Sequence, residues 1–184
     1  MKKIYKILSS KNIYINPWIK VREDKVIQPG GKEGIFGVVE MKAGSTVLAL
    51  NSKNEAYLIK EYKYAIERES IELVTGGLDG NETALDAAKR ELKEETGIDA
   101  GRWIDLGVVD PFTTVIKSPN HMFLALDIKE GRQFLEEGER LKVMKHPFEE
   151  VIRMVMDSEI THSASCACIL KAARYLEENG HNVA

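Results

Sequence analysis

Short runs of hydrophobic and β-branched residues occupy the first 62 positions, and turn-forming residues interrupt them. The turn signals are Asn16-Pro17, Pro29-Gly30-Gly31 and the polar stretch 51–54. Runs of this length between such turns are typical of strands. We therefore expect an N-terminal half built from strands, over residues 13–15, 18–27, 35–41, 46–50 and 56–62.

The hydrophobic period changes after Asn81. Ala84, Leu85, Ala88 and Leu92 recur at the spacing of one helical face. This pattern predicts a helix over 83–96, with Asn81 as its N-cap and Gly97 as its C-terminal stop.

Strands are expected again over 103–109 and 121–128, followed by two helices. Pro147 opens the first of these helices, and the second runs over 163–178 and stops before Asn179-Gly180. The first should present one apolar face, made of Val151, Ile152, Val155 and Met156. This order is not a regular strand–helix alternation, so it favours an α+β fold with a layered mixed sheet.

The size and charge of the chain narrow the function classes. Its 184 residues, 43% hydrophobic and 30% charged, suit one globular domain with at most a small subdomain. The net charge of −3 provides no general attraction for nucleic acid or an acidic membrane surface. Neither an export signal nor a long apolar run is found, so we expect a cytoplasmic protein. Cys166 and Cys168 fit best as two small buried residues.

One face of the predicted helix over 83–96 carries three carboxylates, from Glu91, Glu94 and Glu95. Like charges at this spacing repel each other, and near a helix C-terminus they also oppose the helix dipole. Two explanations are open. The face is either solvated and compensated by nearby Lys and Arg residues, or it binds a hard divalent cation through its oxygens.

The whole segment resembles the Nudix box, the signature of the Nudix hydrolase superfamily. That pattern requires nine residues at fixed spacing, and all nine are present: Gly76, Glu82, Arg90, Glu91, Leu92, Glu94, Glu95, Gly97 and Ile98. From average residue usage, a chance match is on the order of 10⁻¹⁰ per starting position. The resemblance therefore favours the cation-binding explanation.

The resemblance implies a Nudix fold, in which a mixed β-sheet lies between helices, and a reaction that needs Mg²⁺ or Mn²⁺. It makes Glu91 and Glu95 the principal metal ligands, with Glu94 sharing the cluster and Thr75 contributing its backbone carbonyl. Arg90 would orient the carboxylates, and we count Glu91 and Arg90 among the catalytic residues. The implied role of Glu82 is to stabilise the loop before the helix.

The segments on either side of the box resemble the ADP-ribose and nucleotide-sugar pyrophosphatases. Glu61-Tyr62-Lys63 and the stretch 71–76 are similar to the approach to the box in that subfamily, which implies substrate-binding roles for Lys63 and Glu72. Downstream, the acidic stretch 136–143 resembles the loop that supplies a further metal ligand and the catalytic base. The matching register makes Glu139 the ligand and Glu137 the base, although a solvated acidic loop is the alternative.

The N-terminal part also resembles this subfamily. The resemblance implies that residues 1–43 form an antiparallel β-strand subdomain that builds a homodimer, with the Nudix domain over 44–184. Trp18 would stack on the base of the substrate, or else serve the core. The implied substrate is ADP-ribose or a related nucleotide sugar such as GDP-mannose.

Two other functions are weighed against this one. The first is a Nudix hydrolase for nucleoside triphosphates or dinucleoside polyphosphates, and the second is a Nudix-like binding module without turnover. An intact box disfavours the binding module. A serine triad is also disfavoured, because Ser163 and Ser165 near His162 lack a nucleophile elbow.

Overall fold

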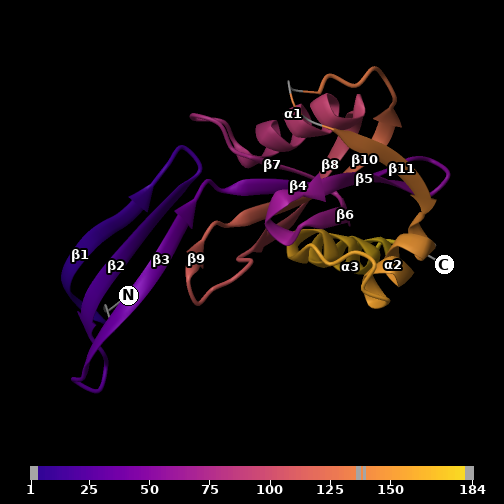
Figure 1. The fold of residues 1–184 in the computed structure, drawn as a ribbon. Coiled ribbons are helices and arrows are strands. Elements are labelled where there is room, and N and C mark those ends of the chain that lie inside the picture. The colour runs from indigo at the N-terminus through magenta and orange to yellow at the C-terminus, as the bar shows by residue number, and fades with distance from the viewer. Residues whose placement is uncertain (1–3, 136–137, 139, 181–184) are drawn as a thin grey trace. The chain divides into compact units, whose positions relative to one another are not determined.

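The computed structural model describes residues 4–135, 138 and 140–180, which divide into two compact units. The first unit contains the residues up to 43 together with 110–119. The second contains 44–109 and the residues from 120 onwards. The chain thus leaves the second unit after β8 (Asp99–Val109), contributes a short segment to the first unit, and returns (Figure 1).

The first unit is a four-stranded sheet with the strand order β1-β2-β3-β9. Its strands are β1 (Lys6–Ile15), β2 (Ile19–Ile27), β3 (Glu33–Met41) and β9 (Ile116–Lys117). The first three are antiparallel, as expected of the N-terminal region, whereas β9 pairs with β3 in parallel. The first strand begins at Lys6 rather than at Ile13, because its earlier part pairs with β2 despite its polar residues.

A buried carboxylate joins the three long strands of this unit. Asp24 on β2 accepts hydrogen bonds from Ser10 Oγ at 2.5 Å and from Arg22 Nε at 3.0 Å. The hydrogen bond from Ser10, followed by that from Arg22, holds the pKa of Asp24 below its ordinary value. Arg22 also pairs with Glu40 on β3. The charge of Asp24 is therefore satisfied inside the sheet.

The second unit is built on a seven-stranded mixed sheet with the central order β11-β5-β4-β10-β8. In addition, β6 pairs with β5 and β7 pairs with β4. The β4–β10 pair is parallel and the other pairs are antiparallel. The strands are β4 (Gly44–Leu50), β5 (Glu55–Lys63), β6 (Arg68–Glu72), β7 (Val74–Gly77), β8 (Asp99–Val109), β10 (Asn120–Lys129) and β11 (Leu141–Pro147).

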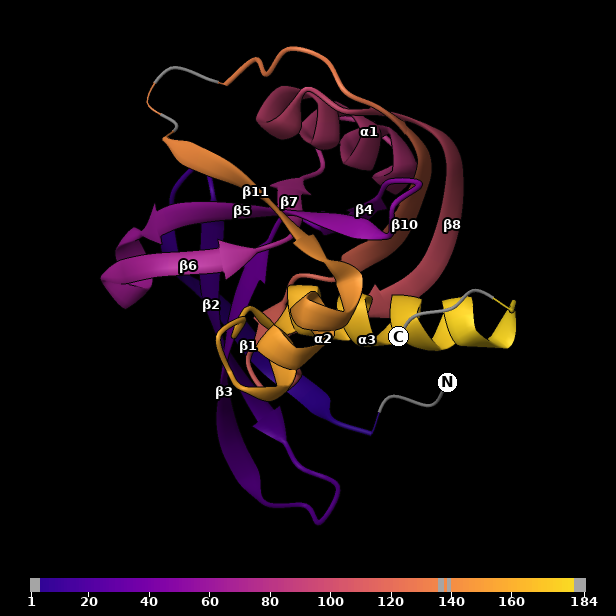
Figure 2. The same cartoon turned by 90° about the vertical axis from the view of Figure 1, so that its right-hand side faces the viewer.

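Helices cover both faces of this sheet, as Figures 1 and 2 show. Helix α1 (Ala84–Thr96) lies on one face, and α2 (Phe148–Met156) and α3 (Ser163–Glu178) lie on the other. A 3₁₀ turn, η1 (Tyr64–Ile66), connects β5 to β6. The expected layered α+β architecture, a mixed sheet between helices, is confirmed.

The central strand β4 is buried on both faces and divides the core into two layers. Leu48 and Leu50 pack in the layer under α2 and α3, whereas Val47 and Ala49 pack in the layer under α1. This alternation follows from the period of two along a strand. Helix α1, which carries the three carboxylates of the predicted site, is therefore fixed to the sheet by its apolar side, including the fully buried Leu92.

The ends of α1 show one prediction confirmed and one wrong. Gly97 stops the helix in the left-handed conformation, with φ of 75°, and its N–H bonds the carbonyl of Lys93. The N-cap is Thr83 and not Asn81, because the Thr83 hydroxyl accepts the N–H of Asp86 at 3.1 Å.

Helix α2 also differs from its prediction at one position. Met156, expected on the apolar face, is 69% exposed, and Met154 is buried in its place. Met154 follows Val151 by three residues and so lies on the same helical face, whereas Met156 follows it by five residues and lies about 140° away round the helix.

The two cysteines are free thiols on α3. Cys168 is fully buried in the core, and this burial raises the pKa of its thiol to about 12. Cys166 is only partly buried. Within the described residues, no helix has both the length and the apolar character that a bilayer crossing requires.

Candidate metal and diphosphate site

Arg90 organises the charged face of α1. Its guanidinium donates through Nε and Nη2 to the two oxygens of Glu82, at 3.0 and 3.1 Å. Nη1 donates to Glu91 at 2.8 Å and to Glu94 at 3.1 Å, and Nη2 also reaches the carbonyl of Gly77. The hydrogen bond with Glu82, followed by those with the other carboxylates, raises the pKa of Arg90. One planar cation thus fixes three carboxylates and the loop before the helix.

Glu82 closes this loop from the other side. One of its oxygens accepts the backbone N–H of Asp79 at 2.9 Å, in addition to the bonds from Arg90. The bonds from Arg90, first, and from Asp79, second, hold the pKa of Glu82 below its ordinary value. The arrangement agrees with the loop-stabilising role that the sequence implied for Glu82.

Glu91 extends from α1 over the backbone of β7. A Cβ atom at Gly76 would overlap the Glu91 carboxylate, so the absence of a side chain at residue 76 makes this approach possible. The strand therefore forms a cradle that brings a carboxylate against the backbone beside Thr75. Oxygen donors of this kind are those that Mg²⁺ prefers, and the residues present fit such an ion.

Glu94 and Glu95 complete the acidic face of the helix. Glu95 is buried, with 8% exposure, whereas the side chain of Glu94 is one-third exposed. Across the described ranges 4–135, 138 and 140–180, no three His, Cys, Asp or Glu side chains already stand together as a metal site. Arg90 Nη1 donates to both Glu91 and Glu94, so these two carboxylates are held beside one guanidinium.

Thr75 is held from beneath by a buried chain of hydrogen bonds. Its hydroxyl lies 3.1 Å from that of Thr46 on β4, which donates to Asn120 Oδ1 on β10 at 2.8 Å. Thr46 is fully buried and Asn120 nearly so. Three strands of the sheet are thus joined below the residue whose carbonyl was expected to bind the metal.

Lys63 provides a cation at the end of β5. Its Nζ lies 2.5 Å from Glu61 and 3.8 Å from Glu72, whose carboxylate is buried. Burial opposes the charge of Lys63, but the hydrogen bond to Glu61 and the charges of Glu72 and Glu95 outweigh it and raise its pKa. The structure thus brings Lys63 and Glu72 together, and the charge of Glu95 also acts on Lys63.

A contact between Glu72 and the start of α3 was missed by the sequence analysis. His162 Nδ1 lies 3.6 Å from the Glu72 carboxylate and 2.8 Å from Ser165 Oγ. The residues are about 90 positions apart in the chain, and neither the spacing nor the residue types marked them as neighbours.

The structure does not test the expected placement of three further site residues. Glu137 and Glu139, the expected base and metal ligand, fall outside the described residues. The segment before them contacts the last turn of α1, where Phe134 N donates to the Glu94 carbonyl at 2.8 Å. Trp18 belongs to the first unit and is 71% exposed. Its contribution to substrate binding stays a prediction.

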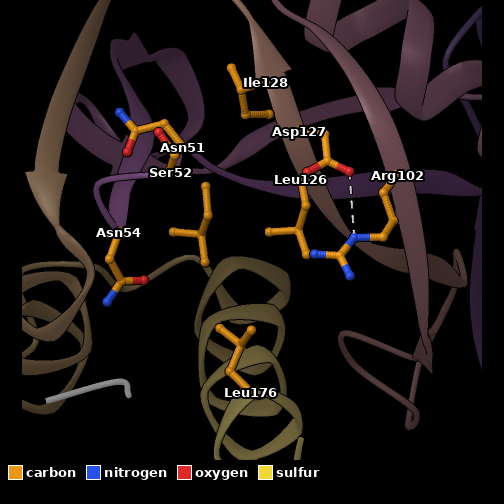
Figure 3. Close-up of a pocket in the computed structure, with 9 residues that line it drawn as sticks. Asn51, Ser52, Asn54, Arg102, Leu126, Asp127, Ile128 and Leu176 are labelled. Atoms are coloured by element: carbon orange, nitrogen blue, oxygen red, sulfur yellow. Dashed lines mark ion pairs between the residues drawn. The ribbon is translucent and has the colours of Figure 1, made fainter. Parts of the chain in front are cut away.

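A separate pocket lies at the other end of the sheet, with a volume of about 380 Å³ (Figure 3). Leu126, Leu176 and the polar loop after β4 line it. Its cation, Arg102, is already paired with Asp127 at 3.6 Å. Its lining includes none of the carboxylates of α1, so this pocket is distinct from the candidate site at α1 and β7.

Comparison with known protein families covers nearly the whole chain. Residues 5–39 match the family of nucleoside diphosphate sugar hydrolase N-terminal domains. Residues 41–163 match the NUDIX domain family, which is more than half of the chain.

Two individual proteins and one solved structure are also similar to this chain. The chain is 27% identical to an ADP-ribose pyrophosphatase of Bacillus subtilis, over 84% of this chain and 85% of that protein. It is 29% identical to an ADP-ribose pyrophosphatase of Mycobacterium tuberculosis, over 90% and 82% of the respective chains. A crystal structure of an ADP compounds hydrolase superposes with a TM-score of 0.85 at 19% identity and covers 98% of each chain, which shows a shared fold.

Proposed function

This chain belongs to the Nudix family, and we propose that it hydrolyses the diphosphate linkage of ADP-ribose or a related nucleotide sugar. The observation that carries the proposal is the cradle at Gly76, where the Glu91 carboxylate lies against the strand backbone. The two relatives named ADP-ribose pyrophosphatase support the substrate class, since each aligns along more than four-fifths of its length.

The reaction that we propose is the in-line attack of water on one phosphorus of the diphosphate bridge. A phosphorus–oxygen bond forms to the water, and the bond to the bridging oxygen breaks with its electron pair. One proton of the water passes to a base, for which we propose Glu137. From ADP-ribose, the products are AMP and ribose 5-phosphate.

A divalent cation, Mg²⁺ or Mn²⁺, would be held by Glu91, Glu94, Glu95, Glu139 and the carbonyl of Thr75. When bound, it would neutralise the charge that develops on the diphosphate and lower the pKa of the attacking water. Arg90 keeps the carboxylates in place. Its hydrogen bonds to Glu91 and Glu94 fix their geometry before the ion arrives.

The proposed substrate contacts lie at the end of β5. Lys63, held between Glu61 and Glu72, would face the diphosphate, because its ammonium is the cation that the electrostatics of this region keep charged. Glu72 has acceptor oxygens for a substrate hydroxyl. Trp18 would stack on the base.

We also propose that the chain forms a homodimer through its first unit. Every residue of β1 is exposed, and large apolar side chains on this unit are exposed as well. They include Ile7, Ile13, Ile35 and Trp18, which are between 53% and 71% exposed. An apolar sheet with an open edge strand is a typical interaction surface. We place the protein in the cytoplasm, where its two free thiols are compatible with a reducing compartment.

The proposed function is tested by a hydrolysis screen with the purified protein and Mg²⁺. The substrates are ADP-ribose, GDP-mannose, UDP-glucose, a dinucleoside polyphosphate and an oxidised nucleoside triphosphate, with products identified by mass. The proposal expects a nucleoside monophosphate and a sugar phosphate as the main products. Cleavage of the triphosphate alone would overturn the substrate class, and no turnover at all would overturn the enzymatic function.

A further inference from the structure

Two side chains in the first turn region of α3 contact the junction between β6 and β7. His162, the residue before the helix, lies within 2.8 Å of Ser165 Oγ through its Nδ1. Ser165 is fully buried, and its Oγ accepts the backbone N–H of Leu73 at 2.9 Å. The helix start is thereby fixed to the residue that directly follows Glu72.

The same imidazole nitrogen faces Glu72. The Nδ1 atom of His162 lies 3.6 Å from Oε2 of Glu72, the oxygen that also lies 3.8 Å from Lys63 Nζ. Glu72 is only 7% exposed. A buried carboxylate needs its polar neighbours, and the loss of one leaves it underpaired and free to move. Lys63 is thus a direct partner of this carboxylate, whereas His162 is linked to its position through Ser165 and the backbone of Leu73.

This trio is not a nucleophilic triad, although it contains an acid, a histidine and a serine. In a triad the serine and the acid bind opposite nitrogens of the imidazole. Here Ser165 and Glu72 both face Nδ1, and Ser165 has no exposed surface. The geometry suits a support for neighbouring residues and not an attack on a substrate.

The hydrogen-bond directions agree with a neutral ring. Burial lowers the pKa of His162, the charge of Lys63 adds to this, and the charge of Glu72 opposes it. A neutral Nδ1 can accept the hydroxyl hydrogen of Ser165, while the Ser165 oxygen accepts the N–H of Leu73. The imidazole Nδ1, the Ser165 hydroxyl and the Leu73 N–H then each have a hydrogen-bond partner.

The support extends to the metal side of the site. The Thr75 hydroxyl, which shares its one hydrogen between Thr46 and the carbonyl of Leu73, lies 3.2 Å from that carbonyl, so Leu73 has polar partners at both its N–H and its carbonyl. A shift of the backbone at Leu73 would therefore move both Glu72, before it, and Thr75, after it.

We propose that His162 is a positioning residue for substrate binding, which acts through Ser165 and the backbone of Leu73 to hold the Lys63–Glu72 pair at the end of β5. The inference rests on the proposed function, since Lys63 and Glu72 contact the substrate only in that account. No role is assigned to His162 in the chemical step. Its loss therefore affects the binding of substrate more than the turnover of bound substrate.

Two amide substitutions at residue 162 separate this role from a merely structural one. The amide of asparagine places a polar atom where Nδ1 lies, whereas that of glutamine reaches the position of Nε2. His162→Asn therefore keeps a partner for Ser165, and His162→Gln loses it. Steady-state KM and kcat for ADP-ribose are measured for both at saturating Mg²⁺, together with thermal unfolding.

We expect His162→Gln to raise KM about 5- to 30-fold, which is the effect of losing one contact in a coupled pair. The kcat of this variant should stay within about threefold of wild type. His162→Asn should restore KM to within about threefold of wild type. In a Glu72→Gln background, His162→Gln should add little, because the residue it positions no longer carries its charge.

An unchanged KM in a folded His162→Gln protein would overturn the inference and leave the proposed function intact. So would a KM increase that is equal in both variants, or one that persists in full in the Glu72→Gln background. If the wild type itself does not hydrolyse ADP-ribose, the proposed function fails, and this inference fails with it.

Discussion

The carboxylate of Glu91 lies directly against the backbone of Gly76, fifteen residues earlier in the chain, and no Cβ fits between them. The glycine of β7 and the glutamate of α1 therefore form one structural element. A side chain at residue 76 has to displace the group that we propose as the main metal ligand. The requirement for glycine here is one of space, since residue 76 is not among the glycines with positive φ.

Gly76→Ala should lower kcat about 10- to 100-fold, because a displacement of a catalytic group by about 1 Å has an effect of this size. The measurement is kcat for ADP-ribose, together with a thermal melt. Gly37→Ala is the matched control, because a Cβ at Gly37 meets no atom within 4 Å. Equal activity of the two variants would show that the close approach of Glu91 has no bearing on catalysis.

Arg90→Lys should reduce activity about 10- to 100-fold, the usual effect of losing a group that orients metal ligands. A lysine keeps the charge but cannot bond Glu82, Glu91 and Glu94 together, because it lacks the planar fork of donors. The apparent affinity for Mg²⁺ should fall as well. Arg174→Lys, on the exposed surface of α3, is the control for the substitution itself. A fully active Arg90→Lys enzyme would contradict the orienting role.

The sequence predicted the elements whose pattern is local. The helix over 83–96, its stop at Gly97 and the buried positions Ala88 and Leu92 depend on spacing and on one glycine, and the structure confirms them. The short strands β6 and β7, of five and four residues, were not predicted as strands. The first forms a hairpin with the preceding β5, and the second pairs with β4, which lies further back in the chain. The N-cap at Thr83 was missed because Asn81 and Thr83 are both good capping residues.

In the candidate site too, local contacts could be predicted from the sequence and contacts between distant segments could not. Arg90 and the carboxylates that it binds lie within one continuous motif, so their proximity could be expected from the sequence. The contacts of His162 with Glu72, and of Ser165 with Leu73, join segments about 90 residues apart. Only the tertiary packing of α3 under the sheet brings them together, and no local pattern encodes it.

The stability of the fold should depend on the protonation of His162. Burial lowers its pKa, with Lys63 adding to the shift and Glu72 opposing it, so the folded protein holds the proton less tightly than the unfolded chain. The resulting stabilisation is complete above pH 6.5, the ordinary pKa, and is lost as the pH falls from there through the lowered folded value. Thermal unfolding of the wild type and His162→Asn between neutral and mildly acidic pH tests this. The variant should lose less stability on acidification, and parallel curves would contradict the prediction.

Ile35→Lys should weaken the proposed homodimer, because it places a charge on an exposed apolar sheet. Light scattering after size exclusion should show a dimeric wild type and a larger monomer fraction for the variant at the same concentration. Met156→Lys, at an equally exposed apolar position on α2 of the second unit, should stay dimeric. A monomeric wild type, or equal effects of both substitutions, would speak against an interface on the first unit.

We propose that the carboxylates of α1 drive a metal-dependent cleavage of a diphosphate linkage. The most direct test compares ADP-ribose hydrolysis by the wild type and Glu91→Gln, with and without Mg²⁺, and identifies the products by mass. The wild type should release AMP and ribose 5-phosphate only when the metal is present. Glu91→Gln should be at least about 100-fold slower in kcat, since metal stabilisation of the transition state amounts to several kcal/mol. Turnover by a folded Glu91→Gln protein within a few-fold of wild type would contradict the account.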